Sequence, residues 1–132
     1  MIVDASALLA MLLRETDAER FAEAVAQARQ CRIGAPTWVE AAMVIDRRGD
    51  REALSAFETF AKRYSLRIEP FTAEHAALAR QAWRDYGRGS GHPAKLNFGD
   101  CLAYGFAKGE REPLLFKGND FVHTDVEPAL KA

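Results

Sequence analysis

Four short apolar runs alternate with longer amphipathic segments along this chain. The runs cover residues 1–3, 31–33, 66–69 and 113–116, and apolar residues at helical spacing fill the segments between them. Strands joined through helices form right-handed crossovers, which build a mostly parallel sheet with helices on both faces. The sequence therefore predicts an α/β fold with a short, mostly parallel sheet.

The helical segments have recognisable starts and stops. Ser6, Thr37 and Asp50 are residue types that open helices, and a glycine-rich stretch over residues 87–93 forms a clear loop. The predicted helices span residues 6–13, about 17–30, 37–49, 50–64, 71–86 and 97–108, and a last weak strand is expected over residues 124–126.

Length and composition limit the class of protein. A chain of 132 residues suits one domain, here residues 1–132, with a formal net charge of -1. Tight non-specific binding of nucleic acid through counterion release usually needs a basic domain, so bulk charge gives it no support. The apolar run over residues 5–13 has no basic segment before it and is too short to span a bilayer. We expect a cytoplasmic protein in which Cys31 and Cys101 are reduced.

Four acidic residues lie where apolar segments meet turns or helix starts: Asp4, Glu40, Asp100 and Asp120. Asp4 ends the first strand and Asp120 follows the last strong one. Carboxyl ends of parallel strands share one rim of the sheet, so these two are expected at the same rim. Clustered carboxylates raise one another's pKa, and a bound cation restores their ionised state. Oxygen ligands from separate segments suit Mg²⁺ or Mn²⁺.

Each acid also has a purely structural interpretation. Asp4 is a suitable helix N-cap, and Asp120 lies in a Gly-Asn-Asp turn. Residues 37–40 match a capping box, and residues 97–100 match one in which Asp replaces Glu. The alternative function is therefore a non-catalytic protein-binding module whose acidic residues are helix caps.

Two other site types fit the sequence poorly. The histidines His75, His92 and His123 have no zinc-site spacing with the cysteines. A phosphoacceptor domain of the receiver type needs an Asp after a middle strand. The predicted strand over residues 31–33 is followed by Gly, Ala and Pro instead, so this type of site is a poor fit.

Four segments carry a family resemblance, in order, over nearly the whole chain. They are Ile-Val-Asp-Ala-Ser-Ala-Leu at residues 2–8, Trp-Val-Glu-Ala at 38–41, the segment 92–104 containing Leu-Asn-Phe-Gly-Asp, and the segment 114–121 containing Gly-Asn-Asp-Phe. This pattern resembles the motifs of PIN-domain ribonucleases, and most closely the VapC-type toxins of bacterial toxin–antitoxin pairs. The last two segments are the specific ones.

The resemblance implies a three-layer α/β/α sandwich with an acidic pocket that holds Mg²⁺ or Mn²⁺ and cleaves single-stranded or loop regions of RNA. By matching position, Asp4 and Asp100 are the expected principal metal ligands. Glu40 and Asp120 are expected to complete the pocket, so all four acids are candidate catalytic residues.

Supporting roles and partners follow from the same resemblance. Ser6 is expected to hydrogen-bond a phosphate oxygen or a water in the pocket, and Asn97 to support the site, although helix capping is the alternative for both. The expected partners are RNA, a second copy of the chain in a homodimer, and a VapB-like cognate antitoxin whose C-terminal segment occupies an apolar groove and blocks the pocket.

Overall fold

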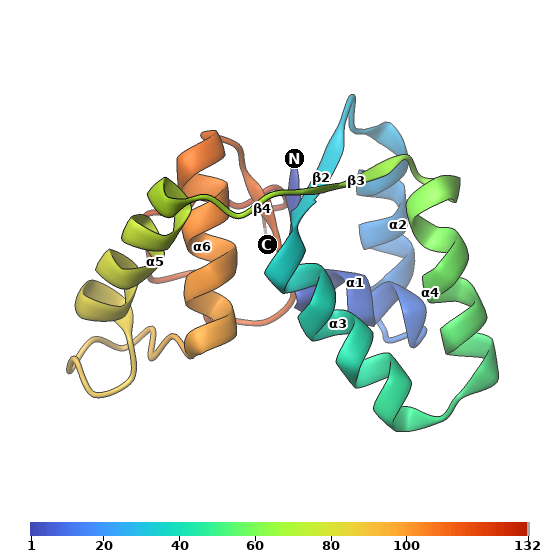
Figure 1. The fold of residues 1–132 in the computed structure, drawn as a ribbon, viewed down its shortest axis with the longest axis horizontal. Helices are drawn as coiled ribbons and strands as arrows, with labels where there is room; N and C mark the ends of the chain where they lie inside the picture. Colours follow the sequence, from blue (N-terminus) through green and yellow to red (C-terminus); the bar gives the residue numbers. More distant parts are fainter. Residues whose placement is uncertain (132) are drawn as a thin grey trace.

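The computed structural model describes residues 1–131 and contains the predicted alternation of strands and helices (Figure 1). The strands are β1 (Ile2–Val3), β2 (Cys31–Gly34), β3 (Leu66–Glu69) and β4 (Leu114–Leu115). The helices are α1 (Ala5–Leu12), α2 (Ala18–Gln27), α3 (Ala35–Arg48), α4 (Arg51–Arg63), α5 (Ala73–Tyr86) and α6 (Phe98–Glu110).

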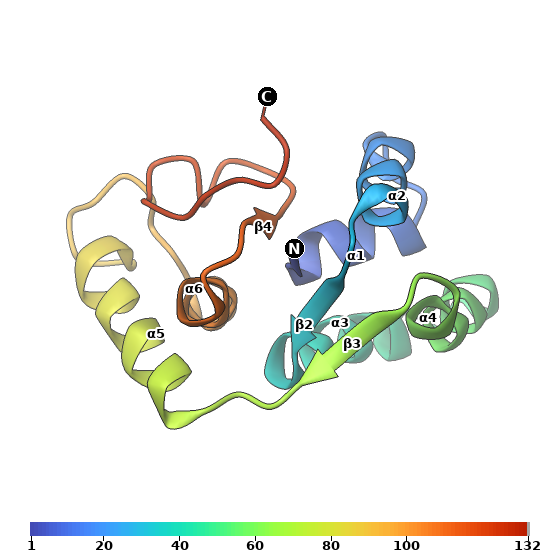
Figure 2. The ribbon, with the colours of Figure 1, turned by 90° about the horizontal axis from the view of Figure 1, so that it is seen from above.

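The four strands form one parallel sheet in the order β3-β2-β1-β4. The chain adds β2 and β3 on one side of β1 and then crosses to place β4 on the other side (Figure 2). Ligands of open parallel sheets bind beyond the carboxyl ends of the strands at such a reversal. The predicted fold class is confirmed, and its topology points to the rim after β1 and β4.

Helices cover both faces of the sheet. Successive side chains of a strand point to opposite faces, so Val3 of β1 packs with Ile33 and Leu115 in a core shared with α1 to α4. Ile2 and Leu114 face the other way, into a second core built with α5 and α6. Figure 1 shows the two helix groups on either side of the strands. The expected three layers are present.

Two of the predicted helix starts are wrong. Helix α1 begins at Ala5 because Asp4, not Ser6, is its N-cap and accepts a hydrogen bond from the Ser6 backbone N–H at 3.1 Å. Helix α3 begins at Ala35 after Gly34, and proline stands in its first turn. Proline is pre-organised for that place, which moves Thr37 inside the helix and removes the predicted capping box. The Asp50 cap of α4 is confirmed.

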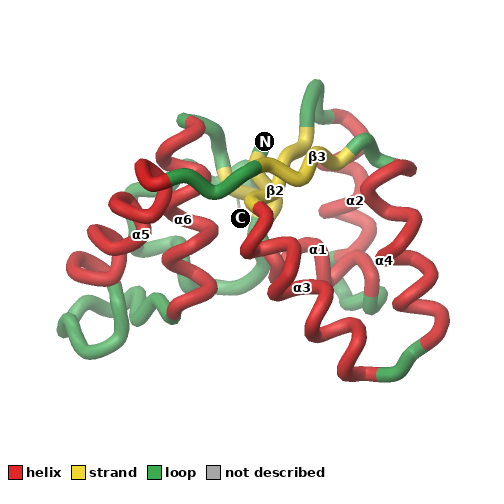
Figure 3. Tube along the Cα trace, viewed as in Figure 1, coloured by secondary structure: helices red, strands yellow, loops and turns green. Residues whose placement is uncertain are grey.

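The predicted strand over residues 124–126 is also wrong. After β4 the described chain runs as turns and loop (Figure 3). The Thr124 hydroxyl donates to the Phe121 carbonyl at 2.8 Å, which closes a turn where the strand was expected. Pairing is limited to one isolated bridge between Leu114 and Pro128.

A charged network lies away from the acidic rim. His75 is buried, its Nδ1 accepts the Thr72 N–H at 2.9 Å, and its Nε2 is 2.8 Å from Glu110. Arg32 also donates to Glu110, at 2.6 Å. Both ring nitrogens are therefore occupied by structural bonds. The two cysteines are free and buried, as predicted. Between residues 1 and 131, no helix combines the length and apolar character that crossing a membrane needs.

Candidate active site

Asp4 is a buried carboxyl group between β1 and β4. Its backbone N–H donates to the Leu115 carbonyl at 2.9 Å, which fixes it beside the end of β4. The Ser6 hydroxyl donates to its Oδ2 at 2.5 Å, in addition to the N-cap bond. Burial raises the pKa of Asp4 to about 6, the Ser6 hydrogen bonds oppose this shift, and the charge of Glu40 adds to it. The side chain is only 4% exposed, so ionising it without a cation is costly.

Asp100 is held by a capping box in the first turn of α6. The Asn97 side-chain oxygen accepts the Asp100 N–H at 2.8 Å, and Asp100 Oδ2 accepts the Asn97 N–H at 3.0 Å. Burial raises the pKa of Asp100 to about 6, with further contributions from the charges of Asp120 and Asp4. The predicted capping box is confirmed, and the residue that makes it also interacts with two other acids.

Glu40 reaches the site from the second turn of α3. Desolvation, and then the charge of Asp100, raise its pKa. A Cβ atom added to Gly99 would lie 2.1 Å from Glu40 Oε2, so this carboxylate lies directly against the backbone of α6. Only glycine at this helix position leaves that space. Gly99 was not predicted from the sequence as a site residue. Glycine lowers the stability of a helix, so a glycine within the predicted helix and next to a candidate acid was a signal of a close contact.

The loop after β4 completes the site. Asp120 is exposed in this loop, and its charge contributes to the raised pKa of Asp100. Ser6 Oγ accepts the backbone N–H of Lys117 at 2.9 Å. Ser6 thus joins the start of α1 to the loop that carries Asp120, a role that neither capping nor phosphate binding predicted.

The four predicted acids therefore form one electrostatically coupled group. In residues 1–131, however, no three His, Cys, Asp or Glu side chains are already arranged as ligands of a single ion. Like charges repel, and Asp4 and Asp100 each direct Oδ2 toward a local hydrogen bond. One oxygen of each is left for another ligand, and an all-oxygen set of donors is the type that Mg²⁺ or Mn²⁺ prefers.

Two apolar residues beside the acids are exposed. Val39 is 44% exposed and Phe98 is 77% exposed. Glu40 as a whole is exposed, although its carboxylate lies against Gly99, so it lies at the mouth of the site.

Comparison with known proteins identifies the family of the chain. The PIN domain family matches the chain over residues 1–127. Ribonuclease VapC28 of Mycobacterium tuberculosis is 48% identical over 130 residues, which cover 98% of each chain. The chain belongs to the VapC ribonucleases of the PIN-domain family. Ribonuclease VapC30 of the same organism is 43% identical over 127 residues, covering 96% of this ribonuclease and 95% of its relative.

A solved structure agrees with the fold of this VapC ribonuclease. Mycobacterium tuberculosis VapC20, described as a toxin that cleaves the sarcin–ricin loop, superposes with a TM-score of 0.68. The match covers 96% of this chain and 98% of the other at 20% sequence identity, which speaks for the fold alone. The predicted family, fold and ribonuclease activity are confirmed, and the protein-binding module without catalysis is not the function.

Proposed function

We propose that this VapC ribonuclease is an endoribonuclease that depends on Mg²⁺ or Mn²⁺ held by Asp4, Glu40, Asp100 and Asp120. The observation that carries the proposal is the position of Asp100, whose pKa is raised to about 6 by burial and by two neighbouring carboxylates. Burial and mutual repulsion make these carboxyl groups costly to ionise. A bound divalent cation stabilises their charged forms and so offsets that cost.

The side chains divide the work by burial and anchoring. Asp4 and Asp100 are fixed by Ser6 and Asn97 and would hold the cation, while the more exposed Glu40 and Asp120 would adjust around substrate. When bound, the cation neutralises charge on the phosphate and activates water, effects worth several kcal/mol. In-line attack of water on phosphorus leaves a 5′-phosphate and a 3′-hydroxyl.

Cleavage of cellular RNA tests the proposal. Purified protein is incubated with total RNA in Mg²⁺ or in EDTA, and new 5′ ends are sequenced. We expect discrete cuts with 5′-phosphates that appear only with the divalent cation. Cleavage that persists in EDTA would show that the acids act without a metal. The positions of the cuts also identify the RNA.

Gly99→Ala should displace the Glu40 carboxylate without destabilising the fold. The added methyl group meets the end of a flexible side chain, and alanine favours helix by about 1 kcal/mol over glycine. We therefore expect an unchanged or slightly raised melting temperature but cleavage reduced about tenfold, equivalent to about 1.4 kcal/mol, because the Glu40 carboxylate is displaced.

The control for Gly99→Ala is a double mutant. If the methyl group acts only through Glu40, Gly99→Ala should add no further loss of cleavage in a Glu40→Ala background. Additive losses, measured as initial rates on one RNA, would instead place the effect of Gly99 elsewhere in α6.

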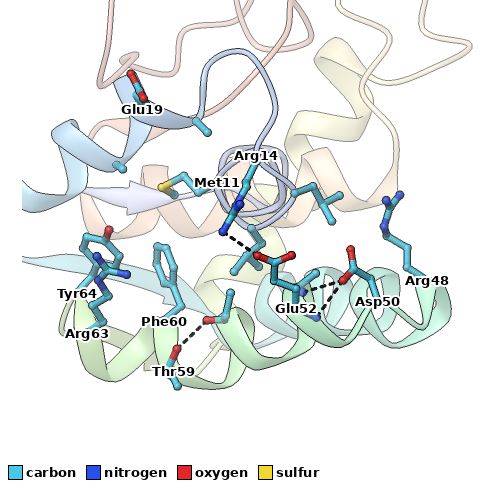
Figure 4. A pocket seen from close by; sticks show the side chains of 16 residues that line it. Met11, Arg14, Glu19, Arg48, Asp50, Glu52, Thr59, Phe60, Arg63 and Tyr64 are labelled. Atoms are coloured by element: carbon cyan, nitrogen blue, oxygen red, sulfur yellow. Dashed lines mark hydrogen bonds and ion pairs between the residues drawn. The ribbon is translucent and has the colours of Figure 1, made fainter.

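The proposed protein partners are a cognate antitoxin and a second copy of the chain. A groove of about 330 Å³ lies between the end of α1, the start of α2 and α4. Figure 4 shows Met11 and Phe60 at this groove and the Arg14–Glu52 ion pair, with a 2.8 Å separation, spanning it. An apolar floor with a charged rim suits an amphipathic antitoxin segment.

A further inference from the structure

An apolar groove runs between α5 and α6 beside the acidic site. On α5, the small residues Ala76 and Ala79 line the groove together with Trp83, which is 46% exposed. On α6, Cys101 lies in the groove and Phe98 stands beside it at 77% exposure. The groove has a volume of about 620 Å³, within the usual range for small-ligand sites. Two large aromatic rings therefore flank a space that small side chains keep open.

The charged residues in this groove are arginines. Arg80 and Arg88 line it, and no Asp or Glu is among its described lining residues. Within residues 1–131 neither arginine takes part in an ion pair. An apolar floor with two available guanidinium groups suits an occupant that is flat and apolar in one part and anionic in another.

The same cationic edge continues into the glycine-rich loop. Arg88 also lines a second hollow with His92 and Lys95. The base of this loop is fixed, because the Arg88 N–H donates to the Leu96 carbonyl at 3.0 Å and the Leu96 N–H donates to Tyr86 at 2.9 Å. The basic edge therefore leads out of the aromatic groove along one surface.

The groove is continuous with the acidic site through one helix turn. Asn97 lines the groove and forms the capping box with Asp100. An occupant of the groove thus lies against the turn that carries a proposed metal ligand.

We propose that this groove is a base-binding subsite, in which an unpaired nucleobase of the RNA substrate stacks on Trp83 and Phe98 while Arg80 and Arg88 contact the adjoining phosphates. The inference rests on the proposed function, because it places the base next to the phosphate cleaved at the acidic site. Proteins that bind single strands combine a cationic groove with aromatic side chains on which bases stack, and this local arrangement is present on a chain whose overall formal charge is -1.

A second copy of the chain is the competing occupant. A two-fold interface places the same patch on both partners. If the two-fold axis passed through the groove, it would bring the Arg80 and Arg88 of one copy toward those of the other, and the described lining residues include no acid to offset them. Charge complementarity therefore favours RNA.

Tryptophan fluorescence provides a direct test. The chain has two tryptophans, and Trp38→Phe leaves Trp83 as the reporter. The probe is a single-stranded RNA of mixed sequence and about 12 nucleotides, added in EDTA so that binding is measured without cleavage. We expect quenching of Trp83 emission, and about tenfold weaker binding for Phe98→Ala, because base stacking on an aromatic residue contributes at this scale.

Matched variants define the outcome. Phe98→Tyr should retain binding, Arg88→Ala should weaken it and reduce its salt dependence, and Ile68→Ala, an exposed apolar residue on β3, should leave it unchanged. Equal binding by wild type and by Phe98→Ala would overturn the inference. A mass halved by Phe98→Ala in light scattering would assign the groove to a second copy and overturn it as well.

The same experiment separates this inference from the proposed function. Quenching is measured in EDTA and does not require the divalent cation. Normal quenching together with RNA cleavage that persists in EDTA would therefore count against the metal site alone. Absent quenching together with Mg²⁺-dependent cleavage would count against the base-binding groove alone.

Discussion

Asp100→Asn should reduce RNA cleavage by at least about 1,000-fold, which corresponds to about 4 kcal/mol of transition-state stabilisation. The expected size follows from the several kcal/mol that a divalent cation supplies at a phosphate. Asparagine keeps an oxygen that can accept the Asn97 N–H, so the capping box of α6 is retained. The substitution removes the negative charge that draws the cation and leaves the local geometry. Initial cleavage rates in saturating Mg²⁺ measure the effect.

Two comparisons make this result specific. Asp46→Asn makes the same chemical change on an exposed position of α3 and should cleave like wild type. Melting temperature and circular dichroism should show that Asp100→Asn is folded. A folded Asp100→Asn protein that cleaves at the wild-type rate would remove Asp100 from the site, and with it the proposed set of four ligands.

The strands were predictable because their signal is local. The segment 66–69 became β3 with unchanged bounds, and alternation of apolar and charged residues over four positions is a local signal for a strand. Helix starts were harder, because neighbouring residues compete for one cap. Asp4 and Ser6 are both good caps, and the outcome depends on how Asp4 is fixed beside β4, a contact with a residue far along the chain.

The candidate site divides in the same way. The Asn97–Asp100 capping box was visible in the sequence because both partners lie three residues apart. The contact between Glu40 and Gly99 was not visible, because it arises from the packing of α3 on α6. Capping and clustering also proved compatible: Asp4 and Asp100 are caps whose carboxyl groups interact with other acids. Their catalytic role remains a prediction.

The second large effect concerns stability, since the acids proposed to serve catalysis should weaken the metal-free fold. The pKa of Asp4 rises from 3.8 to about 6 on folding, chiefly through burial. Between these values the unfolded chain has released a proton that the folded chain retains, so the free energy of unfolding falls as pH rises. At about 1.36 kcal/mol per pKa unit, the loss from Asp4 approaches about 3 kcal/mol and is complete above about pH 6. Below about pH 4 it is absent.

Asp4→Asn removes this pH-dependent cost. In EDTA the variant should gain about 2 to 3 kcal/mol relative to wild type between about pH 4 and about pH 7.5, as measured by urea unfolding. The buried amide of asparagine has its own cost, but that cost does not change with pH, so the difference between the two pH values isolates ionisation. Asp46→Asn should show no such change. A gain equal at both pH values would mean that Asp4 is not held protonated in the folded chain.

Adding Mg²⁺ should reverse the order of stability. A ligand that binds only the folded state raises the free energy of unfolding in proportion to the logarithm of its concentration above the Kd. Wild type at about pH 7.5 should therefore gain stability with Mg²⁺ while Asp4→Asn gains little. Ionised Asp4 would then lower the stability of the metal-free fold and also be required to bind the cation, and cation binding would offset the lost stability. Equal stabilisation of both proteins by Mg²⁺ would place the cation away from Asp4.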